Sequence, residues 1–390
     1  MPIKNRYAEM HQEITEWRRD FHTHPELMFE VHRTAAKVAD LLRSFGCDEV
    51  VEGIGRTGVV GVIRGKSSNS GKVVGLRADM DALPIHEATN LEYASQTPGM
   101  MHACGHDGHT AMLLGAAKYL TETRNFNGTA VVIFQPAEEG GAGGLEMCRD
   151  GLMERFGIQE VYGMHNTPGL ATGQFAIRPG ALLASSDEFE IVVTGKGGHA
   201  ATPHDCVDTT VVAAQILLSL QTIVSRNVDP LKRVVVTVGT FKTDSVASNV
   251  IAHTVRMEGT VRTLDSEYRK MAEERIREIA KGTAAALGAK AEINWTSGYP
   301  VTMNTPENTV YAAEVARSVA GAVDDNVDPI MPAEDFSYML EERPGAYIFL
   351  GNGDTPMCHH PAYNFDDEAI PAGASWYSGM IESRMPFAAS

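Results

Sequence analysis

Residues 101–110, MHACGHDGHT, place three histidines, a cysteine and an aspartate within ten positions of a glycine-containing segment. Cys104 and His106 can both turn toward one point, and thiolate and imidazole are ligands that zinc and similar metals favour. The spacing argues against a structural zinc site, because the sequence has no CxxC pair and no second pair at finger spacing. The remaining ligands must therefore come from distant parts of the chain, as they do in a catalytic metal site.

Three further segments carry side chains that can complete such a site. QPAEEG contributes the neighbouring carboxylates of Glu138 and Glu139, GMHN contributes His165, and CHHP contributes His359. Neighbouring side chains at a strand end point in opposite directions, so one carboxylate can bind metal while the other accepts a proton from the attacking water. Five ligands that include a bridging thiolate suit two ions about 3.5–4 Å apart. The candidate ligands are Cys104, His106, Glu139, His165 and His359.

The apolar segment that begins at Val73 ends in RADMD, which contains two aspartates, Asp79 and Asp81. Carboxylates at such a place can cap a turn, or they can orient a metal-binding side chain and tune its basicity. We assign this orienting role to both aspartates, and Asp79 is the main candidate. His22 and His24, in FHTHPEL, are expected to be structural.

Uninterrupted apolar runs precede most of these reactive groups. Runs without alternation are typical of strands that helices cover on both faces. Open α/β sheets bind ligands beyond the carboxyl ends of their strands, so we expect one crevice to collect the groups. The segment HTAMLLGAAKYLTET fits a crossover helix between two such strands. The predicted strands cover residues 73–81, 130–140, 160–166 and 346–353.

The middle of the chain has a different pattern. Its expected elements follow the order β-α-β-β-α-β, which is that of a ferredoxin-like split βαβ unit. We therefore predict a small α+β domain inserted into a larger α/β domain. The predicted divisions are 1–181 and 298–390 for the larger domain and 182–297 for the insertion. The elements of the insertion are expected at 188–196, 207–225, 233–241, 252–262, 266–287 and 291–295.

The segment GIGRTG (53–58) matches the glycine pattern of dinucleotide-binding proteins. That pattern requires a helix after the glycines, whose N-terminus holds the pyrophosphate. The β-branched run VVGVIRG follows instead, so we expect a hairpin or tight turn and no nicotinamide cofactor.

Composition and charge narrow the class of protein. A chain of 390 residues with 43% hydrophobic residues favours two globular domains. A net charge of −17 argues against nucleic acid or an anionic membrane as a partner. No apolar run approaches the roughly 20 residues of a membrane span, and the first twenty residues lack the apolar core of a signal peptide. The five scattered cysteines form no disulfide framework, so we expect a cytoplasmic protein.

A series of motifs covers nearly the whole chain: HPEL, RADMDALP, MHACGHDGHT, QPAEEG, GMHN, GKGGHAATPH, SNVIAH, AEDF and HHPAYNFDD. In this order they resemble the aminoacylase / hippurate-hydrolase family of metal-dependent amidohydrolases, which also includes hydrolases of indole-acetyl amino acids. CGHDGH and PAEEG together are highly specific for that resemblance.

The resemblance implies a fold, a cofactor and an assembly. The fold is a zinc-peptidase-like catalytic domain, a mixed sheet flanked by helices, with an inserted α+β ferredoxin-like lid or dimerisation domain. The cofactor is two divalent ions per subunit, whether zinc, manganese, cobalt or nickel, and the assembly is a homo-oligomer, a dimer or tetramer joined through the lid domain.

The same resemblance assigns roles to individual residues. Glu138 is the catalytic glutamate. His199, in GGHA, helps to bind the scissile carbonyl from its own subunit or across a dimer, and Asn249, in SNVIAH, contacts the substrate. The metal ligands fall on Cys104, His106, Glu139, His165 and His359.

Two positions bear on how the family's pattern applies to this chain. The family has His-x-Pro near the C-terminus, and His359 is in register with it, but Cys358 and His360 flank it, so either of these is an alternative ligand. Asn364 stands where an aspartate is common, which weakens a contact outside the ligand shell.

We therefore expect an enzyme that hydrolyses N-acyl amino acids, of the hippurate, N-acetyl or N-benzoyl type, to a carboxylate and a free amino acid. A water activated by two metals attacks, with Glu138 as general base and then acid. One alternative is a dipeptidase or carboxypeptidase-like metallopeptidase, whose motifs would be the same. Another is a non-catalytic metal- or ligand-binding protein of the same fold. Glu138 favours an enzyme, because a binding module needs no such carboxylate. The acyl group and the amino acid stay open.

Overall fold

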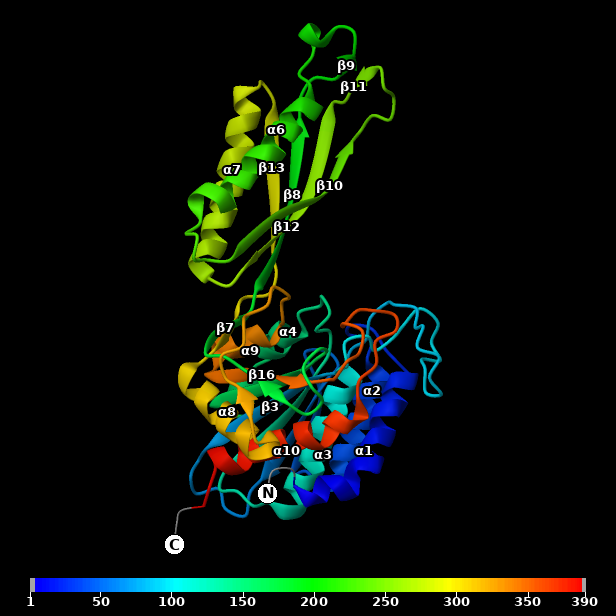
Figure 1. Ribbon diagram of the computed structural model, residues 1–390, viewed down its shortest axis with the longest axis vertical. Helices are drawn as coiled ribbons and strands as arrows, with labels where there is room; N and C mark the ends of the chain where they lie inside the picture. The colour runs from blue at the N-terminus through cyan, green and yellow to red at the C-terminus, as the bar shows by residue number, and fades with distance from the viewer. Residues whose placement is uncertain (1–3, 388–390) are drawn as a thin grey trace. The chain divides into compact units, whose positions relative to one another are not determined.

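The computed structural model describes residues 4–387 and contains two compact units. The first unit comprises the chain up to Leu182, Met303–Asp328 and the residues from Asp335 onward. The second comprises Leu183–Thr302 and Pro329–Glu334. Figure 1 labels many of the elements of each unit.

An eight-stranded mixed sheet forms the centre of the first unit. Its three middle pairings, β4 with β3, β3 with β5 and β5 with β16, are parallel, and the β1–β2 and β2–β4 pairings at one edge are antiparallel. The middle strands are almost wholly buried, as the uninterrupted apolar runs predict. In spatial order the strands are β1 (Glu49–Ile54), β2 (Gly58–Arg64), β4 (Thr129–Gln135), β3 (Val73–Asp79), β5 (Glu160–Thr167), β16 (Gly345–Gly351), β6 (Phe175–Ala176) and β15 (Val323–Asp324).

Helices cover this sheet. The central helix α3 (His106–Thr123) is buried along most of its length, where it packs against α1 (Asn5–Thr23), α2 (His32–Phe45) and α10 (Ile370–Arg384). The apolar face of α1, which includes Met10, Ile14 and Phe21, is buried. The helices α8 (Pro306–Ala320) and α10 also pack on each other, as do α4 (Gly143–Arg149) and α9 (Phe336–Glu342). The sheet with its helices confirms the predicted fold class of this unit.

The second unit is an antiparallel sheet with two helices. The helices α6 (Thr209–Thr222) and α7 (Ser266–Ala286) contact each other and, together with the strands, contribute the apolar residues of a separate core. The order along the chain is β-α-β-β-α-β, as predicted, and the spatial order β10-β12-β8-β13 is that of a ferredoxin-like sheet. Its strands are β8 (Ser185–Thr194), β10 (Val234–Thr243), β12 (Thr254–Thr263) and β13 (Lys290–Ser297).

The glycine-rich segment at 53–58 forms the turn between β1 and β2, where Ile54 pairs with Gly58. Gly53 and Gly55 have φ angles of 83° and 59°, which a residue with a Cβ adopts only with strain. The predicted hairpin is therefore confirmed. The remaining short elements are α5 (Leu152–Arg155), β7 (Gly180–Leu183), β9 (Gly198–His199), β11 (Val250–Ile251) and β14 (Thr302–Asn304).

Among residues 4–387, no helix is both long enough and apolar enough to cross a membrane.

Gly259 tests the packing of the second unit. It lies in the middle of β12, where a Cβ would clash with the Phe189 ring and with the backbone oxygen of Thr237. Because that oxygen belongs to the neighbouring strand and cannot move aside, we expect Gly259→Ala to destabilise the unit by about 1–3 kcal/mol.

The matched control is Gly282→Ala in α7, where an added Cβ would meet no described atom within 4 Å. Because alanine has a higher helix propensity than glycine, this substitution should stabilise the unit by up to about 1 kcal/mol. Thermal unfolding followed by circular dichroism measures both. A Gly259→Ala protein with the wild-type unfolding midpoint contradicts the packing argument.

Candidate metal centre

The candidate ligands of the first unit come from four separate segments. Cys104 lies in the loop before α3, and His106 is the first residue of that helix. Glu139 follows the end of β4, His165 lies near the carboxyl end of β5, and His359 follows β16. The parallel strands β4, β5 and β16 end at the same edge of the sheet, so their loops meet there.

The side chains of these segments converge. Cys104 Sγ lies 3.4 Å from Nε2 of His165, and Oε1 of Glu139 lies 3.3 Å from Nε2 of His359. Three groups drawn from these segments overlap, and in each of them the ligand atoms lie within 4.8 Å of one another. Two of these groups share Cys104, so its thiol lies between two sets of ligand atoms. The groups are Cys104–His106–His165, Cys104–Glu139–His359 and His106–Glu138–Glu139.

The charges around His106 fit a cation. Nε2 of His106 is buried and, among the residues that the structure describes, has no hydrogen-bond partner; the nearest carboxylate oxygens lie at 3.7 Å and 3.9 Å. Burial alone would lower the pKa of His106, but the carboxylates of Asp79 and Asp81 raise that pKa to about 10. Sulfur, nitrogen and oxygen donors together suit divalent transition metals. The donor set and the buried, unpartnered nitrogen therefore fit a metal site.

Strained backbone presents the groups. Gly105 caps α3 with a φ of 87°, and a Cβ there would clash with the side chains of Asn166 and Tyr363. Ala137 and His359 adopt φ angles of 54° and 68°, which are uncommon for residues other than glycine. Strain of this kind clusters at functional sites, where the surrounding structure maintains it.

Glu138 and Glu139 lie in a turn rather than in a strand, because β4 ends at Gln135. The expectation that their carboxylates point in opposite directions is wrong, since both come within 4.8 Å of the His106 ring nitrogen. The alternation of a strand does not apply after the left-handed backbone of Ala137.

Asp81 holds this turn. Its two carboxylate oxygens accept hydrogen bonds from the backbone N–H groups of Glu138 at 3.0 Å and Glu139 at 3.1 Å. One of the same oxygens lies 3.4 Å from Nδ1 of His106. Asp81 is buried, and burial raises its pKa. A single carboxylate thus positions two glutamates and a histidine.

Asp79 contacts a histidine that sequence reasoning did not select. Oδ1 of Asp79 lies 2.6 Å from Nδ1 of His109, and Nε2 of His109 accepts a hydrogen bond from the backbone N–H of Asn166 at 2.9 Å. Through His109, Asp79 is therefore linked to Asn166, the residue that follows His165. The other carboxylate oxygen of Asp79 accepts a hydrogen bond from Arg77 at 2.8 Å. The position of His109 three residues after His106, on one helix face, is the signal that could have identified it.

The segment after β16 places His359 in the Cys104–Glu139–His359 ligand group, whereas His360 belongs to no ligand group among the described residues. Nδ1 of His360 accepts a hydrogen bond from the backbone N–H of Ala362, and the side chain is exposed. The side-chain oxygen of Asn364 accepts hydrogen bonds from the guanidinium of Arg18 at 3.1 Å and from the hydroxyl of Tyr93 at 3.3 Å.

The two remaining predicted residues belong to the second unit. His199 ends β9, where it pairs with Val250 of β11, and the backbone N–H of Ala200 donates to the carbonyl of Asn249 at 2.9 Å. His199 and Asn249 thus lie on adjacent segments, and both are exposed.

The two histidines expected to be structural belong to α1 and the residue that follows it. His22 is buried, with Nδ1 at 2.8 Å from Asp107 and Nε2 at 3.2 Å from Glu87. His24 is half-exposed, and its Nδ1 lies 2.9 Å from the carbonyl oxygen of Asp20. Neither belongs to a candidate ligand group in the described part of the chain.

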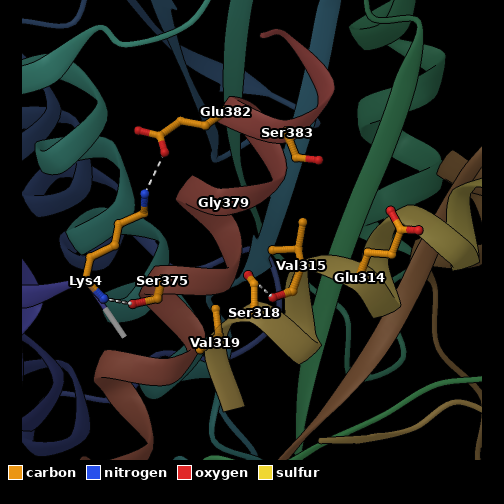
Figure 2. A pocket seen from close by; sticks show the side chains of 9 residues that line it. All are labelled: Lys4, Glu314, Val315, Ser318, Val319, Ser375, Gly379, Glu382 and Ser383. Atoms are coloured by element: carbon orange, nitrogen blue, oxygen red, sulfur yellow. Dashed lines mark hydrogen bonds and ion pairs between the residues drawn. The ribbon is translucent and has the colours of Figure 1, made fainter. Parts of the chain in front are cut away.

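A pocket of about 400 Å³ lies elsewhere on the first unit (Figure 2). Lys4 crosses it, where its backbone N–H donates to Ser375 at 3.2 Å and its ammonium group pairs with Glu382 at 2.6 Å. These contacts attach the start of α1 to α10. The pocket contains none of the candidate ligands; its lining is Lys4, Glu314, Val315, Ser318, Val319, Ser375, Gly379, Glu382 and Ser383.

Comparison with known proteins yields one family and several relatives. The model of peptidase family M20/M25/M40 matches residues 75–383. A hippurate hydrolase of Campylobacter jejuni is 44% identical, covering 95% of this chain and 96% of its own. An N-acetylcysteine deacetylase of Bacillus subtilis is 39% identical, and the match covers 94% of this chain and 96% of the relative. Thermostable carboxypeptidase 1 of Saccharolobus solfataricus is also 39% identical, and the match covers 95% of each chain.

A solved structure shows the same fold. It is a Bacillus subtilis protein described as a dinuclear metal binding peptidase from the M20 family. It is 35% identical, with a TM-score of 0.85, and the match covers 96% of this chain and 98% of that one.

The clamp formed by Asp81 can be tested by metal binding. Asp81→Asn keeps the size of the side chain but removes one of the two oxygens that accept from Glu138 and Glu139. Partners of this kind typically contribute 10–100-fold to affinity, so we expect Mn²⁺ to bind about 10–100-fold more weakly. Titration calorimetry on chelator-stripped protein measures the affinity. The control is Asp354→Asn, the same change at an exposed loop position. Equal affinities of Asp81→Asn and wild type would refute the clamp.

Proposed function

The chain belongs to peptidase family M20/M25/M40, and on that premise we propose that it is a metal-dependent amidohydrolase that splits N-acyl amino acids into a carboxylate and a free amino acid. The observation that carries the proposal is the buried carboxylate of Glu138, within 4.8 Å of ligand atoms of both His106 and Glu139. A proton acceptor beside a metal site is what amide hydrolysis needs.

We assign the sulfur, nitrogen and oxygen donors at the sheet edge to two divalent ions. Cys104 is the shared ligand, because its thiol belongs to both the His106–His165 group and the Glu139–His359 group. The relative described as dinuclear metal binding supports two ions. When bound, such ions would polarise the acyl carbonyl and lower the pKa of the attacking water. The assigned ligands are Cys104, His106, Glu139, His165 and His359.

Glu138 moves the proton. Its carboxylate takes a proton from the attacking water and then delivers it to the nitrogen of the leaving amino acid. The backbone of Glu138 is fixed by Asp81, so the carboxylate is held in position before the substrate arrives. Pre-positioning of this kind removes an entropic cost from the reaction.

Substrate recognition in this proposal includes the second unit. We assign His199 to the scissile carbonyl and Asn249 to another part of the substrate, on the basis of the motifs GGHA and SNVIAH. Their adjacent segments, β9 and β11, keep the two side chains in one region of that unit.

A peptide substrate is the second candidate. The carboxypeptidase from Saccharolobus solfataricus is as similar to this chain as the N-acetylcysteine deacetylase is. The bond cleaved is an amide in both cases, so the same carboxylate and ligands serve either substrate. The hippurate hydrolase, at 44% identity, favours the N-acyl amino acid.

A substrate panel tests the function. N-benzoylglycine, N-acetylmethionine, N-acetylcysteine and a dipeptide are each incubated with the protein, and the released amino acid is measured. We expect chelator to abolish release and added Mn²⁺ or Zn²⁺ to restore it, with at least one N-acyl amino acid cleaved faster than the dipeptide. Preference for the dipeptide would support the peptidase, and no turnover of any compound by metal-loaded protein would refute the proposal.

Glu138 and Glu139 give a matched pair of variants. Glu138→Gln removes the proton acceptor and leaves the assigned ligands in place, so we expect kcat to fall by about 10²–10⁴-fold with unchanged metal content. Glu139→Gln removes an assigned ligand, so metal content itself should fall. Elemental analysis and initial rates measure both. Full turnover by Glu138→Gln would overturn its assignment as general base.

A further inference from the structure

Cys358 lies beside Cys104, although 254 residues separate them in the sequence. The thiol of Cys358 points toward the backbone of Cys104, with its Sγ 4.0 Å from the carbonyl oxygen of that residue. In the described part of the chain, Cys104 belongs to two candidate ligand groups and Cys358 to none. One thiol of the pair is thus a candidate ligand and the other is not.

The backbone holds the two cysteines against each other. The N–H of His359 donates to the carbonyl of Ala103 at 2.7 Å, one residue away from each cysteine. The side-chain amide of Asn166 donates to the carbonyl of Cys104 at 2.6 Å and fixes that residue from the other side. Disulfides form where the backbone already brings two cysteines close together, because larger separations require the chain to move.

The other three cysteines lie elsewhere. Cys47 lies just before β1, Cys148 lies in α4, and Cys206 belongs to the second unit. Cys104 is 8% exposed, whereas Cys358 is more exposed. A small oxidant from solvent therefore reaches Cys358 more easily than Cys104.

We propose that Cys104 and Cys358 form an oxidation site, at which a peroxide converts the two thiols into a disulfide. The thiolate of Cys358 attacks one oxygen of the peroxide and becomes a sulfenic acid, and the other oxygen leaves as water. Cys104 then attacks the sulfenic sulfur, the S–S bond forms and a second water leaves. The two thiols together lose two protons and two electrons, and the peroxide is reduced to two waters. A dithiol reductant reverses the reaction by exchange.

The disulfide would empty the metal centre, a consequence that rests on the proposed function. Metals bind the thiolate form of cysteine, and a disulfide sulfur carries no such charge. Oxidation therefore removes the ligand shared by both groups. Conversely, bound metal occupies the Cys104 sulfur and protects it, so the metal-loaded and disulfide forms exclude each other.

The experiment uses the full chain, both chelator-stripped and loaded with Mn²⁺, treated with hydrogen peroxide. Intact mass reports the loss of two hydrogens, and non-reducing peptide mapping identifies the linked cysteines. We expect a Cys104–Cys358 linkage in stripped protein, much slower formation in loaded protein, and reversal by dithiothreitol. Cys358→Ser should form no linkage, whereas the control Cys148→Ser should form it like the wild type. No linkage in stripped protein, or a linkage through other cysteines, would overturn the oxidation site.

A second measurement separates this proposal from the proposed function. The oxidised protein is isolated, and its binding of Mn²⁺ is titrated before and after reduction. Loss of binding that dithiothreitol restores supports both the oxidation site and the role of Cys104 as a ligand. A mapped Cys104–Cys358 disulfide with unchanged Mn²⁺ binding would support the oxidation site and overturn the ligand assignment.

Discussion

The concentration of negative charge around one buried imidazole is the constraint on which the site depends. The carboxylates of Asp79, Asp81, Glu138 and Glu139 surround His106. Like charges at such distances repel strongly in a buried environment, so positive charge must lie among them. Arg77 balances Asp79 at 2.8 Å, and His106 itself has a pKa raised to about 10. The two divalent ions proposed above would offset the remaining negative charge of the cluster.

The rest of the first unit serves to hold that charge in place. Parallel strands bring distant segments to one sheet edge, and the turns that follow adopt uncommon backbone conformations at Gly105, Ala137 and His359. Each turn is fixed by a side chain from another segment: Asn166 at Cys104, and Asp81 at the glutamate pair. Rigid surroundings are what allow strained residues to persist, and they fix the ligand atoms before any ion binds.

The sequence predicts the architecture well because burial leaves a simple pattern. Uninterrupted apolar runs predicted the central strands, and the predicted β-α-β-β-α-β order of the middle segment is the order of elements in the second unit. The turn after β4 could not be predicted, since its course depends on Asp81, which lies 57 residues away from Glu138. The pairing of His109 with Asp79 and the approach of Cys358 to Cys104 are likewise products of tertiary folding. The local pattern of apolar residues indicates which segments are buried. Contacts between residues far apart in the sequence depend instead on the order and direction of the strands in the sheet.

In the proposed function, the assigned ligands and Glu138 do not set the substrate preference. An N-acyl amino acid and a peptide present the same amide bond, and one set of ligands with one proton acceptor can cleave either. Relatives named for a hippurate, an N-acetylcysteine and a carboxypeptidase activity are each 39–44% identical to this chain over most of its length. Differences in acyl group and amino acid must therefore be recognised by side chains outside the ligand set. Two such side chains, those of His199 and Asn249, were assigned to the substrate in the proposed function, and both are exposed on adjacent segments of the second unit.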